Sequence, residues 1–330
     1  MKKKVLLLGL GNFGRSWANS VLPKCAEFAE FVGAVDRNVE THKKAPEGVR
    51  LFTDLDEAIA ETSPDLVVNV TPPDAHTAIN KKLVDLGIPV LCEKPISGGL
   101  EDAKDLLAYL QTKDGFVMIG ENYRYSATLR RAREVLDEVD LGALHLIEGH
   151  FRHYHADYSA FYHGHLAHPL LTDVTIHHLD VARYLSGQEP RTVSCREWGA
   201  PYTWYDYRPA TASILTEMTN GVVCHYFGTL ASPVTTTTWN GDWELEFDRG
   251  TFRLQNDKIT VTTKEGTVEY AKDARYPSDG RITMLREALT AIEEGRAGET
   301  DIHDNYKSFA WMQAAVISSE KGETVEIEKL

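Results

Sequence analysis

A glycine-rich segment near the N-terminus restricts the fold of this chain more than any other sequence feature. Gly9, Gly11 and Gly14 follow a short apolar run and open a helical pattern. At a strand-to-helix turn with this spacing, the first glycine permits a tight turn, the second lets the backbone approach a pyrophosphate, and the third allows close helix–strand packing. The segment therefore predicts a dinucleotide-binding βα unit, in which Asn12 and Phe13 begin the anion-binding helix.

Apolar strand-like runs alternate with helical patterns along the first 122 residues. Such alternation is typical of βαβ units and of a parallel sheet with helices on both faces. The predicted strands are Val5–Leu8, Phe31–Val35, Val49–Phe52, Leu66–Val70, Val90–Cys92 and Val117–Gly120. We therefore expect an α/β fold that begins with a doubly wound parallel sheet over residues 1–122.

The pattern changes after residue 122. Helical patterns at about 128–139, 172–185, 282–294 and 305–321 are separated by runs with strand character, several of which alternate with period two. These strands are predicted at Ala143–Arg152, Val193–Trp198, Ser213–Met218, Val222–Thr229, Trp243–Phe247, Thr251–Leu254, Ile259–Thr263, Thr267–Tyr270 and Val325–Ile327. The second part is thus expected to be an α/β domain with a large, mostly antiparallel open sheet.

An acidic residue at the end of the second strand bears on cofactor choice. Asp36 lies 22 residues after Gly14, where a carboxylate accepts a hydrogen bond from a ribose 2′-OH and repels a 2′-phosphate. NAD is therefore favoured over NADP. Arg37, the next residue, argues against strict selectivity for NAD over NADP.

Four further residues are assigned to the cofactor site. Thr71 and Pro72 follow the fourth strand and have the turn chemistry of a loop that passes over a cofactor, with His76 one helical turn later. The alternative is that the prolines merely end the strand and His76 is a surface residue. Asn122, after the last of these strands, is assigned to the same site.

The tripeptide Glu93-Lys94-Pro95 places an amine beside this site. It closes the apolar strand Val90–Cys92, and the proline stops the strand by removing an N–H donor at the carboxyl edge of the sheet, where open α/β folds bind ligands. In this context Lys94 faces a cofactor, whereas an isolated Glu-Lys-Pro would more often be a solvated loop.

A helical pattern in the second half carries Asp173, His177, His178 and Asp180. Positions 173, 177 and 180 are spaced i, i+4, i+7 and share one face of a helix. Asp173 can then orient His177 and raise its basicity, as a general base for an alcohol proton requires. The alternative is a capping Asp173 beside core histidines.

Together these motifs resemble the Gfo/Idh/MocA family of NAD(P)-dependent oxidoreductases over the whole chain. The resemblance implies a Rossmann domain at 1–122, a substrate-binding and oligomerisation domain at 123–302, and a final segment, 303–330, that packs back on the Rossmann domain. It implies that Lys94 contacts the reacting oxygen near the nicotinamide, that His177 is the general base or acid, and that Asp173 orients the pair and binds substrate. Glu93 would support the nicotinamide ribose.

The implied activity is hydride transfer between NAD and a secondary alcohol of a sugar, glycoside or polyol. Two alternatives stay open. The family also contains redox-neutral enzymes that oxidise a ring carbon transiently and so cleave or epimerise a glycoside. The other alternative is a catalytically silent NAD-binding sensor, against which the intact Lys94, Asp173 and His177 argue.

Eight of the thirteen histidines fall within residues 150–178. We expect this segment to line a polar pocket and assign His153 and His155, together with Arg124, to substrate binding. The i, i+2 spacing of His153 and His155 would also suit a metal ion. Dinucleotide chemistry needs no metal, so none is expected. Arg152 is the segment's only strong cation, which favours an uncharged carbohydrate over a sugar phosphate.

Charge and cysteine usage limit partners and location. The net charge of −14 argues against nucleic acid and anionic membranes as partners, since both need a basic patch. The four cysteines lack Cys-x-x-Cys spacing, so neither a disulfide nor zinc is expected, and the first apolar run is too short for a signal peptide. A cytoplasmic protein is expected, forming a homodimer or homotetramer through the C-terminal sheet, one face of which the remaining helices cannot cover.

Cofactor preference provides the first testable prediction. Asp36→Ala should raise the Kd for NAD about tenfold or more, since hydrogen bonds to a charged group contribute roughly 1.5–3 kcal/mol, and should reduce discrimination against NADP. Fluorescence titration of both cofactors measures this. Tighter binding of NADP than of NAD by the unaltered protein, or unchanged affinities in the variant, would contradict it.

Overall fold

The structure, a computed structural model, describes residues 2–154, 166–199 and 208–328. The chain forms two compact units. The first contains Met1–Asn122 and Pro277–Tyr306, and the second contains Tyr123–Tyr276 and Lys307–Leu330. Each unit is described by itself.

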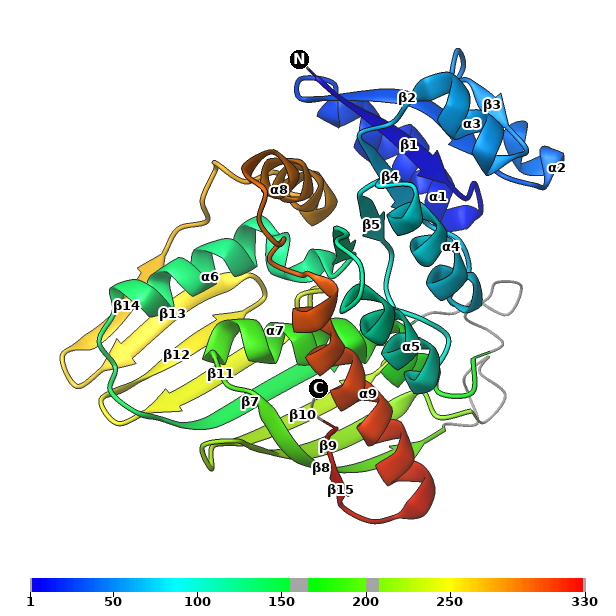
Figure 1. The fold of residues 1–330 in the computed structure, drawn as a ribbon. Helices are drawn as coiled ribbons and strands as arrows, with labels where there is room; N and C mark the ends of the chain where they lie inside the picture. The colour runs from blue at the N-terminus through cyan, green and yellow to red at the C-terminus, as the bar shows by residue number, and fades with distance from the viewer. Residues whose placement is uncertain (1, 155–165, 200–207, 329–330) are drawn as a thin grey trace. The chain divides into compact units, whose positions relative to one another are not determined.

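The first unit contains a six-stranded parallel sheet in the order β3-β2-β1-β4-β5-β6 (Figure 1). Its strands are β1 (Lys3–Leu8), β2 (Ala29–Val35), β3 (Leu51–Phe52), β4 (Leu66–Asn69), β5 (Val90–Cys92) and β6 (Val117–Ile119). Its α-helices are α1 (Asn12–Ser16), α2 (Val39–His42), α3 (Leu55–Thr62), α4 (Pro73–Asp85), α5 (Leu100–Leu110) and α8 (Gly280–Glu294). This order confirms the predicted doubly wound Rossmann sheet.

The central strands of this sheet are apolar throughout because both faces are covered. Val5, Leu6 and Leu7 in β1 have no exposed surface, and neither do Val67 and Val68 in β4. Continuous burial of this kind is typical of parallel strands between helical layers. Strand order reverses between β1 and β4, so ligands are expected at the carboxyl ends of these two strands.

The second unit contains a nine-stranded sheet in the order β14-β13-β12-β11-β7-β10-β9-β8-β15. Its strands are β7 (Leu144–Arg152), β8 (Pro190–Trp198), β9 (Thr211–Met218), β10 (Val223–Thr229), β11 (Asp242–Phe247), β12 (Gly250–Gln255), β13 (Lys258–Thr263), β14 (Gly266–Tyr270) and β15 (Val325–Glu326). Neighbouring strands are antiparallel except for β7 and β10. The prediction of a mostly antiparallel sheet is thus confirmed.

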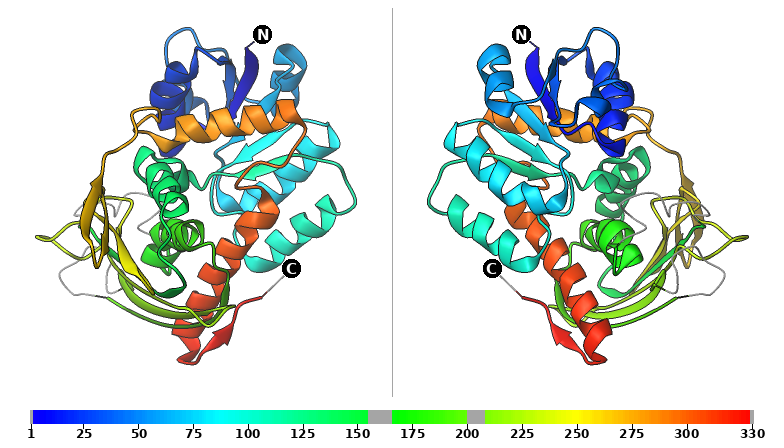
Figure 2. Two further views of the ribbon diagram at one scale, coloured as in Figure 1. Left: turned by 90° about the vertical axis from the view of Figure 1, so that its left-hand side faces the viewer. Right: turned by 90° about the vertical axis from the view of Figure 1, so that its right-hand side faces the viewer.

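Two helices, α6 (Ala127–Glu138) and α7 (Ile176–Ser186), lie against one side of this sheet (Figure 2). Alternate side chains of β10 reflect this arrangement: Tyr226 is buried on the helix side, whereas Phe227 points to the other side. On that other side Leu215 is 52% exposed. This bare face is where the sequence leads us to expect a second copy of the chain.

The C-terminal part of the chain is divided between the two units. The sequence instead led us to expect that 303–330 as a whole packs on the Rossmann domain. Helix α9 (Ile302–Lys321) contains the division, and Lys307–Leu330 belongs to the second unit. The indole of Trp311 donates to Thr216 Oγ1 over 2.9 Å, Ser318 Oγ accepts from the Cys195 N–H over 2.9 Å, and β15 pairs with β8. These contacts attach the tail to the large sheet.

Residues 277–302 also differ from expectation, because they belong to the unit of the parallel sheet. Helix α8 packs there, with the Arg286 guanidinium 4.1 Å from the centre of the Phe28 ring. The chain returns to the first unit before α8 and leaves it again within α9, whereas the sequence predicts a single boundary at 302.

All four cysteines are buried free thiols. Burial raises the pKa of Cys25, Cys195 and Cys224 to about 12, so these thiols are unreactive near neutral pH. Among the helices that the structure describes, none combines the length and apolarity needed to cross a bilayer.

Candidate functional site

The three glycines of the N-terminal segment have three different environments. Gly9 has a φ of +101°, and a Cβ there would lie 2.7 Å from the Val70 carbonyl oxygen. A Cβ on Gly14 would lie 2.0 Å from the Gly9 oxygen, so the helix contacts the strand end directly. A Cβ on Gly11 would meet nothing within 4 Å. The backbone at Gly11 is thus open to a ligand, as a bound pyrophosphate requires.

Asp36 is fixed at the carboxyl end of β2, directed at the glycine segment. Its Oδ2 accepts a hydrogen bond from the Leu10 N–H over 2.7 Å, and its Oδ1 accepts one from the Asn38 N–H over 2.9 Å. Each carboxylate oxygen retains acceptor capacity for a ribose hydroxyl. Arg37 is exposed beside it.

The fingerprint helix is connected to the Glu-Lys-Pro segment by a buried hydrogen bond. Helix α1 continues as a π-helical turn, η1 (Trp17–Val21), and the indole of Trp17 donates to Glu93 Oε1 over 2.8 Å. The Arg281 guanidinium lies 5.2 Å from the Phe13 ring centre and 5.7 Å from that of Trp17. Sequence analysis missed Trp17 and Arg281; the only available signal was a tryptophan three residues after the last fingerprint glycine.

Asn69 organises the loop that carries Thr71 and Pro72. Its Oδ1 accepts from Thr71 Oγ1 over 2.7 Å, and its Nδ2 donates to Asn80 Oδ1 over 2.9 Å. Asn69 has no exposed surface. An asparagine at the end of the otherwise apolar strand β4 was the signal for this residue, which the sequence analysis did not use.

His76 connects two cofactor-side loops instead of facing a ligand. It has no exposed surface, and its Nδ1 and Nε2 lie 2.9 Å from the Pro95 oxygen and 2.8 Å from the Thr71 oxygen. Both the assignment to direct cofactor contact and the surface alternative are therefore corrected. Burial lowers the pKa of His76 despite these carbonyl contacts, so in the neutral ring only one nitrogen carries a hydrogen.

Lys94 and Asn122 also lie at the carboxyl edge of the parallel sheet, after β5 and β6. Lys94 follows the buried Glu93 directly after β5, is half-buried, and is joined to Pro95 by a cis peptide bond. Asn122 follows β6, with its N–H donating to the Gly120 oxygen over 2.9 Å. The glycine segment, Asp36, Thr71, Glu93-Lys94 and Asn122 thus follow the carboxyl ends of five parallel strands, a donor set that fits a dinucleotide.

His177 lies in the second unit, near the start of α7. Its side chain is 4% exposed, and its ring stacks on Tyr123 with the centroids 4.1 Å apart and the planes 9° from parallel. Asp173 is half-buried within a π-helical turn, η5 (Leu170–Thr175), that precedes α7. The spacing argument assumed a regular α-helix from 173 to 180, which this turn interrupts. Sequence spacing also gave no signal for Tyr123.

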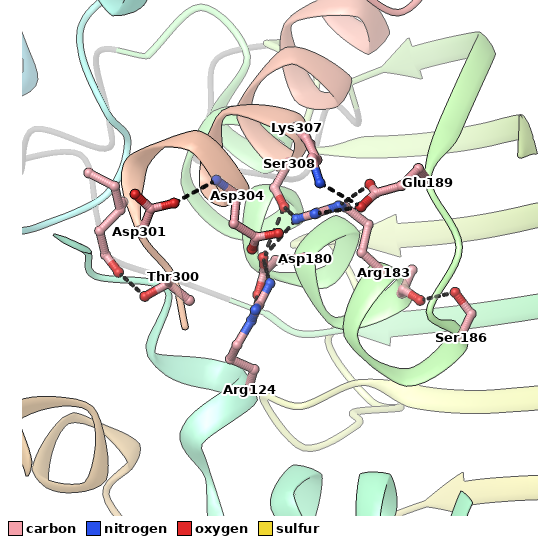
Figure 3. Close-up of polar contacts among 12 residues, drawn as sticks. Arg124, Asp180, Arg183, Ser186, Glu189, Thr300, Asp301, Asp304, Lys307 and Ser308 are labelled. Atoms are coloured by element: carbon pink, nitrogen blue, oxygen red, sulfur yellow. Dashed lines mark hydrogen bonds and ion pairs between the residues drawn. The ribbon is translucent and has the colours of Figure 1, made fainter. Parts of the chain in front are cut away.

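Asp180, the third residue of that motif, belongs to a buried charge network (Figure 3). Arg124 Nε donates to Asp180 Oδ2 over 2.7 Å, and Ser308 Oγ donates to Asp180 Oδ1 over 2.9 Å. Arg183 donates to Ser308 Oγ and, through Nε and Nη2, to Glu189. Arg124 is 6% exposed. In the structure the Arg124 guanidinium neutralises a buried carboxylate, and substrate binding by Arg124 stays a prediction.

His178 anchors α7 to the sheet. Its Nε2 lies 2.9 Å from the Trp239 carbonyl oxygen, which can only accept, so Nε2 carries the hydrogen and Nδ1 accepts from Tyr226 Oη over 2.7 Å. Burial raises the pKa of Tyr226 and so keeps the phenol protonated. His178 is thus a core histidine whose two ring nitrogens both have partners.

His153 lies in the same region, with its ring stacked 4.5 Å from that of Trp239. Burial lowers the pKa of His153. His155 lies outside the described residues, as do His163 and His165. Within the described ranges, no group of three or more His, Cys, Asp or Glu side chains is arranged to hold a metal ion.

Comparison with known proteins identifies the family. The family model "Oxidoreductase family, NAD-binding Rossmann fold" of GFO_IDH_MocA matches residues 3–121, and "GFO/IDH/MocA C-terminal domain" matches residues 129–268. The chain belongs to the Gfo/Idh/MocA family. The resemblance expected from the motifs is thereby confirmed, as is NAD as the cofactor of its Rossmann domain.

Relatives match along nearly the full length. The chain is 23% identical to a D-apiose dehydrogenase from Paraburkholderia graminis, covering 99% of this chain and 90% of that protein. It is 24% identical to an inositol 2-dehydrogenase from an Arthrobacter species, covering 98% and 96%. An oxidoreductase from Agrobacterium radiobacter, solved with NAD+, L-tartaric acid and magnesium, has the same fold, with a TM-score of 0.89, 23% identity and 99% of each chain covered.

The buried ion pair between Arg124 and Asp180 gives a prediction about the stability of this Gfo/Idh/MocA protein. Arg124→Met should lower the free energy of unfolding by roughly 3 kcal/mol, because removing one partner leaves the Asp180 charge uncompensated. Arg124→Met combined with Asp180→Leu should recover most of that loss. Chemical denaturation measures both. Unchanged stability with a raised KM in Arg124→Met would instead support substrate binding by Arg124.

His76 gives a prediction about cofactor affinity. His76→Leu leaves the carbonyl that the neutral ring bonds without its donor and should raise the Kd for NAD roughly 5- to 100-fold, since a buried acceptor left without a donor costs about 1–3 kcal/mol. His76→Asn can replace only the Nδ1 contact and His76→Gln only the Nε2 contact, so the milder variant identifies the nitrogen that carries the hydrogen. Fluorescence titration with NAD, alongside thermal unfolding, measures this. A wild-type Kd in a folded His76→Leu protein would disprove the positioning role.

Proposed function

We propose that this protein transfers hydride between NAD and a secondary alcohol of a sugar, glycoside or polyol. The observation that carries the proposal is the position of Lys94: it follows strand β5 at the carboxyl edge that also carries the glycine segment, Asp36 and the Thr71 loop. An amine at that edge can reach the reacting end of a dinucleotide. Relatives named for apiose and inositol dehydrogenation support this substrate class.

The residues of the chain have separate tasks in this reaction. A ring nitrogen of His177 takes the hydroxyl proton, while the Lys94 ammonium donates a hydrogen bond to the oxygen as negative charge develops on it. Stacking on Tyr123 fixes the plane of the His177 ring, and Asp173 orients His177 and binds a substrate hydroxyl. Bound NAD would supply the hydride acceptor for the carbon that bears this oxygen.

A substrate screen tests the proposal. The panel contains D-apiose, myo-inositol, D-glucose and D-xylose as ring compounds, D-sorbitol and glycerol as open-chain polyols, and aryl glycosides. NADH absorbance and released aglycone are both followed. NADH formation supports the proposal; aglycone release without net NADH would instead establish the redox-neutral alternative, and a protein that binds NAD but converts nothing would favour a sensor.

The proposed pair gives a kinetic prediction. Lys94→Ala and His177→Ala should each lower kcat by roughly 10²–10⁴-fold, the usual contribution of a positioned proton-transfer group, with the Kd for NAD nearly unchanged. His225→Ala is the matched control, because His225 lies on β10 on the bare side of the sheet with Phe227. Full activity in either variant with the substrate found in the screen would refute the role of that residue.

A further inference from the structure

Trp239 is a large aromatic side chain that remains exposed within a densely packed part of the second unit. It is 41% exposed. Its ring stacks on His153, with centroids 4.5 Å apart and planes 25° from parallel, and lies 5.6 Å from the Phe151 ring. Exposure of a tryptophan loses the favourable burial that its large apolar surface would provide. An indole that ring contacts hold in place while part of its surface stays exposed is suited to pack against a ligand.

The turn that carries Trp239 is fixed by hydrogen bonds on both sides. The Thr237 N–H donates to the Arg152 oxygen over 2.9 Å, and the Trp239 oxygen accepts from His178. Asn240 Nδ2 donates to Asp257 Oδ1 over 2.8 Å, while its carbonyl oxygen accepts from the Trp243 indole over 2.8 Å. The indole is thus presented by a pre-organised turn, as binding groups in effective sites are.

The same cluster extends to the proposed base. The Trp239 oxygen is bonded to His178, the residue after His177. Tyr123 stacks on His177 and meets the edge of His178, with the centroids 5.7 Å apart. Phe151 lies 4.8 Å from His178. Trp239 and His177 therefore belong to one contiguous group of rings in the second unit.

Among the residues that the structure describes here, two buried guanidinium groups already have carboxylate partners. Arg124 is bonded to Asp180, and Arg183 to Glu189. The Arg152 guanidinium lies 4.8 Å from the Phe227 ring centre, and Phe227 is on the side of the sheet away from His178. An aromatic surface next to imidazole rings matches a ligand with apolar C–H groups on one face and hydroxyls on its rim better than it matches a phosphate or carboxylate.

We propose that Trp239, supported by His153, is the platform on which the substrate ring packs, so that the substrate is an uncharged cyclic sugar or cyclitol. This inference rests on the proposed function and narrows it. An open-chain polyol presents no fixed apolar face and gains less from a flat surface. The platform determines which ring and which hydroxyl are presented to His177, and takes no part in proton or hydride transfer.

The test compares Trp239→Leu and Trp239→Phe with a matched control, Trp198→Leu. Trp198 is 42% exposed, and its ring lies 6.2 Å from that of Phe227, on the opposite side of the sheet from His178. Trp239→Leu should raise the KM for the ring compounds of the panel about tenfold, which corresponds to about 1.4 kcal/mol, with kcat and the Kd for NAD little changed. Trp239→Phe should have a smaller effect, and Trp198→Leu none.

Binding measured without turnover separates this proposal from the proposed function. Saturation-transfer NMR with myo-inositol, D-glucose, D-xylose and D-apiose, in the presence of NAD, should show binding that Trp239→Leu weakens. Such binding without any NADH formation would overturn the proposed function and leave the platform standing. NADH formation with equal KM values in wild type and Trp239→Leu would overturn the platform alone. Absence of binding to every ring compound would also overturn it.

Discussion

The nucleotide half of this protein depends on a contact that leaves no room for a side chain. Gly14 packs so closely on the carbonyl of Gly9 that a Cβ would lie 2.0 Å from that oxygen. This contact sets α1 against the end of β1, and Trp17 is therefore positioned to donate its indole hydrogen to Glu93. A motif at residues 9–14 and another at residues 93–95 are thus held together through one buried bond, and His76 attaches the Thr71 loop to the second motif.

In the second unit, the position of His177 depends on the contacts that hold helix α7. Asp180 binds Arg124, and Tyr123, the residue before Arg124, stacks on His177. His177 and Asp180 are spaced i, i+3 on α7, so one helix face contacts two consecutive residues. The ion pair between Arg124 and Asp180 therefore contributes to the site indirectly, because it fixes the segment that supports the His177 ring. On another side, His178 ties the helix to Tyr226 and Trp239.

Sequence patterns predicted the strands well because burial on one or both faces dictates their residue types. The apolar runs of β1, β4 and β5 and the alternating runs of β9 and β10 leave few other options. Patterns did not predict how Arg124 is used, since a guanidinium suits a buried aspartate as well as a ligand. Patterns also could not show that α9 is divided between the two units, because an apolar helix face is compatible with either partner.

Two π-helical turns interrupt regular helical spacing near the functional residues. One, η1, begins at Trp17, and the other, η5, contains Asp173. A turn that contains one extra residue offsets the side chains beyond it by about 100° from the α-helical register. The relation between Asp173 and His177 is therefore not the i, i+4 relation of a regular helix, whereas His177 and Asp180, both beyond the turn, keep theirs. Turns of this kind are less stable than a regular α-helix. Both lie next to residues of the candidate site: η1 begins with Trp17, which bonds Glu93, and η5 contains Asp173. The side-chain positions that these turns produce can offset their cost in stability.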